Sequence, residues 1–417
     1  MLDINFIIEN PEKVKKACRD KGVDDKVVDR FLKVDEQRRQ LILDIEKTRK
    51  KKNELMHGIS KKPDKTIIDQ GKKLKELLSR LEPDLRAVEE QFQDLILQLP
   101  NIPAIDVPIG KDESENKIVK KWGKIPKFSF KPKDHLELGE QLDFIDVKRA
   151  VKVSGTRFGY LKNEAVLLEF ALIQYGLGVL IKKGFVPVIP PILIKDKMMR
   201  GMGYLEHGGD QETYHLDKDG LYLVGTSEQS LGPMHTEEVL KKKELPRRYL
   251  GFSTCFRREA GSYGKDTRGI FRVHQFDKLE MFSFTLPSES DKEHKFLLSL
   301  EEKLVQALEI PYRVVEMCTG DLGHPAARKY DIECWLPSHK KYRETHSTST
   351  CTDYQARRLS IRYRRKDGQT EFVHTINGTF FAQRLIIAIL ENYQQKDGSV
   401  KIPKVLQKYV GKEIISV

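Results

Sequence analysis

The chain has 417 residues, and 39% of them are hydrophobic, enough to build a large core divided over two or three domains. Lysine and arginine outnumber the acidic residues 74 to 62, so the formal net charge is +12, which favours polyanion partners such as nucleic acid. The five cysteines are scattered without a CxxC pair, which argues against a disulfide framework and against zinc and indicates reduced thiols in a cytoplasmic protein.

The amino-terminal residues MLDINFIIENPEK carry acids where a signal peptide carries positive charge. The most apolar segment, Ala165 to Ile181, is interrupted by Glu169 and Gln174 and is shorter than the roughly 20 residues of a membrane span. We therefore expect a buried helix at this segment and a soluble protein with no membrane partner.

Residues 27–98 are expected to form an antiparallel two-helix coiled-coil arm. Apolar residues recur there with alternating steps of four and three, the pattern of a heptad seam: Leu74, Leu78, Leu81, Leu85, Val88, Phe92 and Leu95. A weaker register precedes it, and HGISKKPDK between the two runs carries turn signals. The second helix, Asp64 to about Leu97, would be roughly 50 Å long, with a kink expected at Pro83.

Charge is uneven along this arm. Residues 47–75 hold 11 lysines and arginines against 3 acids, whereas residues 76–98 hold 2 against 6. A solvated helix surface would explain this alone. However, a positive tip also suits contacts with phosphate groups, which need cations and little sequence specificity.

Residues 99–133 contain five prolines and the polar run KDESENK, which predicts a linker with at most one short strand. From residue 134 onward, alternating apolar segments mix with helical ones. This predicts an α+β domain over residues 134–417, after an amino-terminal domain over residues 1–98.

The most informative stretch runs from Phe256 to Phe284. Two segments of strand composition flank GSYGKDTRG, which indicates a β-hairpin with a glycine-rich loop. Because strand side chains alternate between faces, we expect Arg272, Phe276 and Glu280 to share a face, matched by Arg257 and Glu259 on the partner strand. Such a face suits a nucleotide and an amino acid, although a ladder of surface salt bridges is the alternative at an arbitrary hairpin.

Two further segments carry candidate residues. In HTINGTFFAQRLIIAILENYQ, residues 377–379 are interpreted as a strand-to-helix junction, and residues 380–393 as a buried helix. Arg384 near the start of that helix is disfavoured by the helix dipole, so an anionic partner is expected: a protein carboxylate or a bound phosphate. In KKYRETHSTSTCTDYQARR, Glu344 and Ser347 form a hard oxygen pair that suits Mg²⁺, although a polar loop is the alternative.

With these residues in view, the chain resembles bacterial-type seryl-tRNA synthetases, which are class II enzymes, over essentially its whole length. The resemblance is carried by the amino-terminal segment, the arm, HLELGEQLDFIDVKRAVKVSGTRFGYLKNEA, KYDIECWLP and the three class II motifs. It implies a class II catalytic domain built on an antiparallel sheet and a homodimer formed through Gly184 to Leu193. It further implies a serine–tRNA ligase whose substrates are L-serine, ATP and tRNA(Ser), with Mg²⁺, and leaves open whether tRNA(Sec) is also charged.

The resemblance also assigns roles to matching residues. Arg257 and Arg384 would be catalytic. The serine-binding set is Thr226, Glu228, Arg257, Glu280, Asn377 and Thr379. The ATP-binding set is Arg257, Glu259, Arg272, Phe276, Glu344, Ser347 and Arg384, with Glu344 and Ser347 as the metal ligands. The tRNA-binding set on the arm is Arg49, Lys50, Lys51, Lys52, Lys61, Lys62, Lys72 and Lys73.

This sequence departs from the family pattern at two places. His346 stands where the family usually has serine, and the interval from Thr379 to Arg384 is one residue shorter. Two alternatives to a serine–tRNA ligase are considered. One is a catalytically inactive tRNA-binding paralogue, and the other is a ligase that loads an amino acid onto a carrier protein. The paralogue should have lost site residues, and the carrier-protein ligase should lack the basic arm.

Overall fold

The computed structural model describes residues 1–57, 65–260 and 269–416, which divide into two compact units, 1–100 and 101–417. In the first unit, short helices α1 (Ile4–Glu9) and α2 (Pro11–Asp20) precede the long helices α3 (Lys26–His57) and α4 (Lys65–Gln98). Asp3 caps α1 by accepting a hydrogen bond from the Phe6 N–H, and α2 begins at Pro11, where a missing N–H costs nothing.

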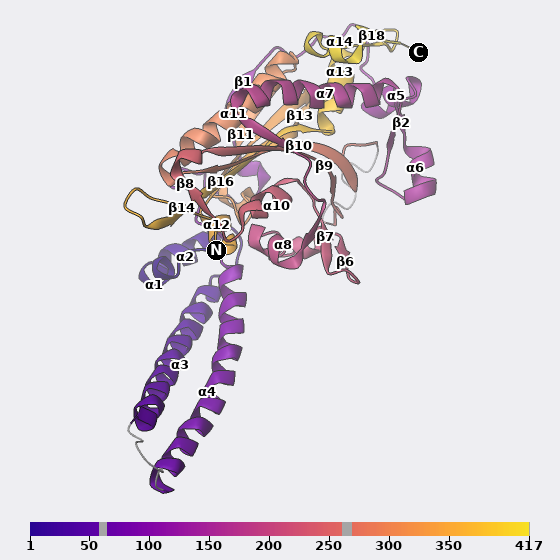
Figure 1. The fold of residues 1–417 in the computed structure, drawn as a ribbon. Helices are drawn as coiled ribbons and strands as arrows, with labels where there is room; N and C mark the ends of the chain where they lie inside the picture. Colours follow the sequence, from indigo (N-terminus) through magenta and orange to yellow (C-terminus); the bar gives the residue numbers. More distant parts are fainter. Residues whose placement is uncertain (58–64, 261–268, 417) are drawn as a thin grey trace. The chain divides into compact units, whose positions relative to one another are not determined.

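Helices α3 and α4 pack along their length, which confirms the predicted two-helix arm (Figure 1). All seven predicted seam residues of α4 are buried or half-buried. Near the base the Phe31 and Phe92 rings lie 5.0 Å apart, and the Arg38 guanidinium covers the Phe92 ring at 4.9 Å. Helix α4 continues through Pro83. The predicted turn between the helices lies outside the described residues.

The second unit is built on an eight-stranded sheet in the order β1-β11-β12-β13-β16-β10-β9-β4. Its neighbouring strands are antiparallel except for β4 beside β9, so the predicted α+β class with an antiparallel sheet is confirmed. The strands are β1 (Lys117–Trp122), β4 (Phe185–Val188), β9 (Arg247–Phe256), β10 (Gln275–Thr285), β11 (Tyr312–Glu316), β12 (Arg328–Leu336), β13 (Lys341–Thr352) and β16 (His374–Ala382). Edge strand β1 falls in the segment interpreted as a linker.

Helices cover both sides of this sheet (Figure 1). On one side lie α7 (Glu164–Leu180), α11 (Ser290–Ala307) and α13 (Arg384–Tyr393), whose apolar side chains form the main core with the sheet. On the other side lie α8 (Asp196–Met202), α10 (Glu228–Leu231) and α12 (Tyr354–Leu359). Smaller elements used below are α5 (His135–Gln141), α6 (Val147–Ser154), β5 (Leu193–Lys195), η2 (Ile181–Lys183) and η3 (Gly232–His235).

The apolar segment Glu164–Lys183 is long and hydrophobic enough to span a membrane by composition, with a mean hydropathy of 1.7. In the structure, α7 packs one face into the core through residues such as Leu168 and Leu172. The predicted buried helix is therefore confirmed for that face. The other face leaves Leu167 and Phe170 about half exposed.

Candidate active site

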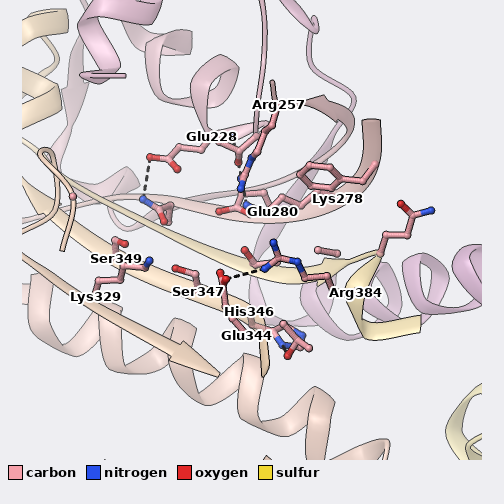
Figure 2. Close-up of a pocket in the computed structure, with 18 of the residues that line it drawn as sticks. Glu228, Arg257, Lys278, Glu280, Lys329, Glu344, His346, Ser347, Ser349 and Arg384 are labelled. Carbon is pink, nitrogen blue, oxygen red and sulfur yellow. Dashed lines mark hydrogen bonds and ion pairs between the residues drawn. The ribbon is translucent and has the colours of Figure 1, made fainter. Parts of the chain in front are cut away.

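All twelve candidate residues of the catalytic domain line one cavity of about 280 Å³ in the second unit. They are Thr226, Glu228, Arg257, Glu259, Arg272, Phe276, Glu280, Glu344, Ser347, Asn377, Thr379 and Arg384. Figure 2 shows Arg257, Glu280, Glu344 and Arg384 directed toward the same space. A salt-bridge ladder on a flat surface does not explain this arrangement, because the groups line one shared cavity.

The floor of the cavity is formed by neighbouring strands. Phe276 and Glu280 are four residues apart on β10, so they share a face as predicted. On β16, Thr379 lies directly opposite Glu280. The antiparallel register thus brings together residues a hundred positions apart in the chain.

The positions of three charged residues were predicted wrongly. Strand β9 ends at Phe256 and β10 begins only at Gln275, so Arg257 and Glu259 follow one strand and Arg272 precedes the other. Glu259 has a left-handed backbone with φ of +51°, which interrupts an extended chain. The three side chains still reach the cavity, from the two limbs of the loop. The loop tip, residues 261–268, lies outside the described residues.

The predicted strand-to-helix junction at residues 377–379 is also wrong. Asn377 and Thr379 lie within β16, and α13 begins only at Arg384. Leu279 pairs with Phe381 and Glu280 with Thr379, so Phe380 is an extra, bulged residue on β16. The phenylalanines therefore extend the strand, and Arg384 is the first residue of the helix. Despite the shortened interval, Arg384 lines the cavity.

Glu344 and Ser347 lie on strand β13, not in a polar loop. They are three residues apart, which in a regular strand would place them on opposite faces. Pairing with β12 skips Thr345, because Ile332 faces His346 while Glu333 faces Glu344. This β-bulge returns both oxygen groups to the cavity face, a common use of bulges beside active sites.

Buried carboxyl groups mark one end of the cavity. Glu280 is 1% exposed, and its Oε2 lies 2.6 Å from the Lys278 ammonium, which also donates to the Thr226 hydroxyl at 3.2 Å. Burial raises the pKa of Glu280, and the Lys278 charge opposes that rise. Glu280 already pairs with one ammonium group, that of Lys278, which shows that its carboxylate is placed to accept hydrogen bonds from an ammonium ligand.

Glu228 lies behind Glu280 and is held by three donors. Its carboxylate accepts hydrogen bonds from Asn377 Nδ2 at 3.0 Å, Tyr204 Oη at 2.9 Å and Gln355 Nε2 at 3.3 Å. Burial and the nearby Glu280 charge raise the pKa of Glu228 to about 7. Because its oxygens are occupied, Glu228 orients Asn377 and Tyr204 around the cavity.

Guanidinium groups and an aromatic ring occupy the other end. Arg257 donates to the Gly225 carbonyl at 3.1 Å, and its guanidinium lies 5.3 Å from the centre of the Phe276 ring. Arg272 donates to Glu259 Oε2 at 3.2 Å. A planar ring beside cations can bind a base and its phosphates, because arginine binds phosphate in bidentate fashion.

Arg384 connects this end to the oxygen pair. It donates to Glu344 Oε2 at 2.8 Å and to the Phe271 carbonyl at 3.2 Å. Burial alone would raise the pKa of Glu344, but the charges of Arg384 and Lys329 outweigh that effect and hold the pKa at about 2. Glu344 is therefore ionised at neutral pH, and with the Ser347 hydroxyl it fits a divalent cation shared with phosphates. Within the described ranges, no three His, Cys, Asp or Glu residues form a metal-binding group.

Several cavity residues were missed from the sequence. Lys278 follows the same period-two pattern as Phe276 and Glu280, so strict use of the alternation would have found it. Lys329 and Tyr204 also line the cavity, but they come from segments without a local signal. His346 lines it too and is 1% exposed, with Nδ1 2.8 Å from the Thr345 hydroxyl.

Comparisons with known proteins identify both units. Residues 213–393 match the family model for the tRNA synthetase class II core domain (G, H, P, S and T), and residues 1–103 match that for the seryl-tRNA synthetase N-terminal domain. The serine–tRNA ligase of Rubrobacter xylanophilus is 44% identical over 420 residues, covering 100% of this chain and 99% of the relative.

Two solved structures are similar over the whole chain. The seryl-tRNA synthetase from Pyrococcus horikoshii complexed with ATP has a TM-score of 0.93 and 43% identity, covering 100% of this chain and 99% of that one. The cytoplasmic serine–tRNA ligase from Naegleria fowleri in complex with AMP has a TM-score of 0.88 and 34% identity, with the same coverage.

The burial of His346 predicts a pH dependence of stability. Burial lowers the pKa of His346 from 6.5 to about 4. Between these values the unfolded chain binds a proton that the folded protein excludes, so folded stability falls as the pH drops from 6.5 to 4. His346→Gln should therefore lose about 2 kcal/mol less stability between pH 7 and pH 5 than the unmodified protein. Urea unfolding at the two pH values measures this, and equal losses in both proteins would contradict it.

Proposed function

The chain belongs to the seryl-tRNA synthetase family and is an ATP-dependent serine–tRNA ligase, and we propose that the cavity between Glu280 and Arg384 is where it activates serine. The observation that supports this site is the convergence of all twelve candidate residues on one cavity. Relatives come from bacteria and archaea alike, so we assign the family as a whole and not a bacterial subgroup. The inactive paralogue and the carrier-protein ligase are set aside.

The serine-binding end comprises Thr226, Glu280 and the residues around them. The ammonium group of L-serine would bind Glu280 and the Thr226 hydroxyl, the two groups that Lys278 contacts in the structure. Asn377 and Thr379 would contact the serine hydroxyl, with Glu228 positioning Asn377. Selectivity over alanine would follow, because a ligand without the hydroxyl leaves buried polar groups unpaired.

The ATP-binding end comprises the ring, the guanidinium groups and the oxygen pair. Phe276 would stack on adenine, Glu259 would support Arg272, and Arg272 would bind the distal phosphates. Glu344 and Ser347 would hold Mg²⁺, which neutralises phosphate charge when bound. The low pKa of Glu344 suits that task.

The reaction requires little acid–base chemistry from the protein. The serine carboxylate attacks the α-phosphate in line, a new O–P bond forms, and pyrophosphate leaves with the electrons of the broken P–O bond. Arg257 and Arg384 would stabilise the negative charge of the transition state, so we assign no catalytic base. The 3′-terminal adenosine hydroxyl of tRNA(Ser) then accepts the seryl group from the adenylate, releasing AMP. We propose a cytoplasmic location for this activity, as in the Naegleria relative.

The basic residues near the tip of the arm are proposed to bind tRNA phosphates. Arg49, Lys50, Lys51, Lys72 and Lys73 are exposed. Lys52 is half-buried in the seam, and Lys61 and Lys62 lie outside the described residues. The Arg49 guanidinium is 2.8 Å from Glu82, so a phosphate would compete with that carboxylate.

We also propose a homodimer formed through Gly184 to Leu193. Strand β4 is at the edge of the sheet, and an exposed edge strand favours a partner. Large apolar side chains are exposed on α7, η2, β4 and the chain up to β5: Leu167, Phe170, Ile181, Val186, Ile189 and Leu193. Such an accumulation is typical of an association surface.

Arg257→Ala should lose at least ~2 kcal/mol of transition-state stabilisation in serine-dependent ATP–pyrophosphate exchange, because its guanidinium faces the developing phosphate charge. The matched control is Arg258→Ala. Arg258 is the next residue, but its guanidinium lies over the Tyr214 ring at 5.6 Å. Near-normal exchange in Arg257→Ala, or equal losses in both variants, would contradict the proposed role.

Deleting residues 36–90 should abolish tRNA charging and spare serine activation, because the deletion removes the basic residues of the arm and leaves the catalytic unit. Arg38 and Glu89 lie 3.8 Å apart, so the deletion joins neighbouring points of the two helices. Pyrophosphate exchange serves as the internal control for folding. Charging at the original rate would show that the arm does not bind tRNA.

Ile189→Glu should convert the dimer into a monomer in sedimentation analysis, because it places a charge on an 85% exposed residue of the proposed interface. Ile105→Glu is the matched control, since Ile105 is fully exposed on a different segment of the same unit. An Ile189→Glu variant that stays dimeric, or an unmodified protein that is monomeric, refutes this interface.

A further inference from the structure

A buried histidine–glutamate pair lies next to the cavity without lining it. His135, the first residue of α5, is 4% exposed, and Glu391 on α13 is fully buried. Glu391 Oε1 accepts a hydrogen bond from the His135 backbone N–H at 3.2 Å and lies 3.5 Å from His135 Nδ1. The other oxygen accepts from the Ser338 N–H and hydroxyl at 3.1 and 2.7 Å. These hydrogen bonds connect α5, α13 and the β12–β13 turn.

The second nitrogen of His135 holds the segment that enters β10. His135 Nε2 accepts a hydrogen bond from the Ile270 backbone N–H at 3.3 Å. Since Nε2 accepts, the ring proton lies on Nδ1, on the side of Glu391. A Cβ added at Gly269 would lie 2.2 Å from Nε2, and the φ of Gly269 is +73°. The histidine ring and this segment are therefore packed too closely for any residue but glycine.

The held segment carries Arg272 and contacts Arg384, two residues of the proposed ATP-binding set. Two guanidiniums lie over the Phe271 ring, that of Arg343 at 4.1 Å and that of Arg384 at 5.0 Å from its centre. The Phe271 carbonyl accepts from Arg384, and Arg272 follows directly. Helix α13 thus fixes the segment twice, through Arg384 at its start and through Glu391 and His135 near its end.

We propose that His135 is a positioning residue for ATP, holding Gly269 to Arg272 so that Arg272 reaches the phosphates. The inference rests on the proposed role of Arg272. A hydrogen bond to backbone suits this task, because it fixes the segment whatever the cavity contains.

The test measures ATP–pyrophosphate exchange by full-length protein. His135→Leu removes the acceptor and leaves the Ile270 N–H buried without it, so the KM for ATP should rise about tenfold, with kcat and the KM for serine within about twofold. His135→Gln can still accept from Ile270 and should recover most of the loss. Gly269→Ala, whose Cβ would crowd Nε2 of the same ring, should reproduce the rise in the KM for ATP.

His235→Leu is the matched control. His235 in η3 is also buried and also has two side-chain partners, Glu238 and Tyr249, but it does not line the cavity. It should leave the KM for ATP unchanged. An equal rise in this control, or a rise in the KM for serine as large as that for ATP, would overturn the positioning role.

A double variant separates this proposal from the proposed function. If His135 acts through Arg272, adding His135→Leu to Arg272→Ala should raise the KM for ATP by a smaller factor than His135→Leu does in the unmodified protein. If the double variant raises the KM for ATP by the product of the two single factors, the inference is overturned. Unchanged ATP binding in His135→Leu beside weakened binding in Arg272→Ala would overturn the positioning role alone. Unchanged binding in Arg272→Ala would remove the role of Arg272 itself, and this inference with it.

Discussion

The pairing of β10 with β16 is the constraint on which the active site depends. It places Glu280 opposite Thr379 and sets Asn377 two residues along the same strand, where it pairs with Ser349 of β13. A slip of one residue would turn Glu280 into the core and expose Met281, which is fully buried. The large apolar core beneath the sheet therefore fixes the positions of the polar groups above it.

Charge balance is the second requirement of this cavity. Glu228 and Glu280 are both almost fully buried; burial raises the pKa of each, and the Glu280 charge raises that of Glu228 further. Lys278 supplies a compensating charge within the same strand face. At the opposite end, Glu344 is held ionised by Arg384 and Lys329. The site is thus arranged as paired charges before a substrate enters, which reduces the reorganisation needed at reaction.

Periodicity made much of this structure predictable from the sequence. The heptad seam from Leu74 to Leu95 gave the arm, and alternation correctly placed Phe276 and Glu280 on one face. Local patterns failed where tertiary pairing decides the outcome. Phe380 and Phe381 begin an apolar segment whose pattern fits a buried helix, but pairing with β10 keeps both residues in a strand. Likewise, nothing in the local sequence marks Thr345 as a bulge or Phe256 as a strand end.

The bulge at Thr345 has a consequence for how the gene can change. Because Glu344 and Ser347 are three residues apart and share a face only through the skipped residue, straightening the bulge at unchanged length would send one of the two oxygen groups to the opposite side of the strand. Loss of one codon between them would instead leave the two residues two positions apart, a spacing that a regular strand keeps on one face. After Thr379 the chain soon leaves the sheet at Ala382, so a codon can be lost there while Arg384 still reaches the cavity. The two oxygen groups of β13 can therefore stay on the cavity face in two ways, with the bulge at the present length or without it in a strand one residue shorter.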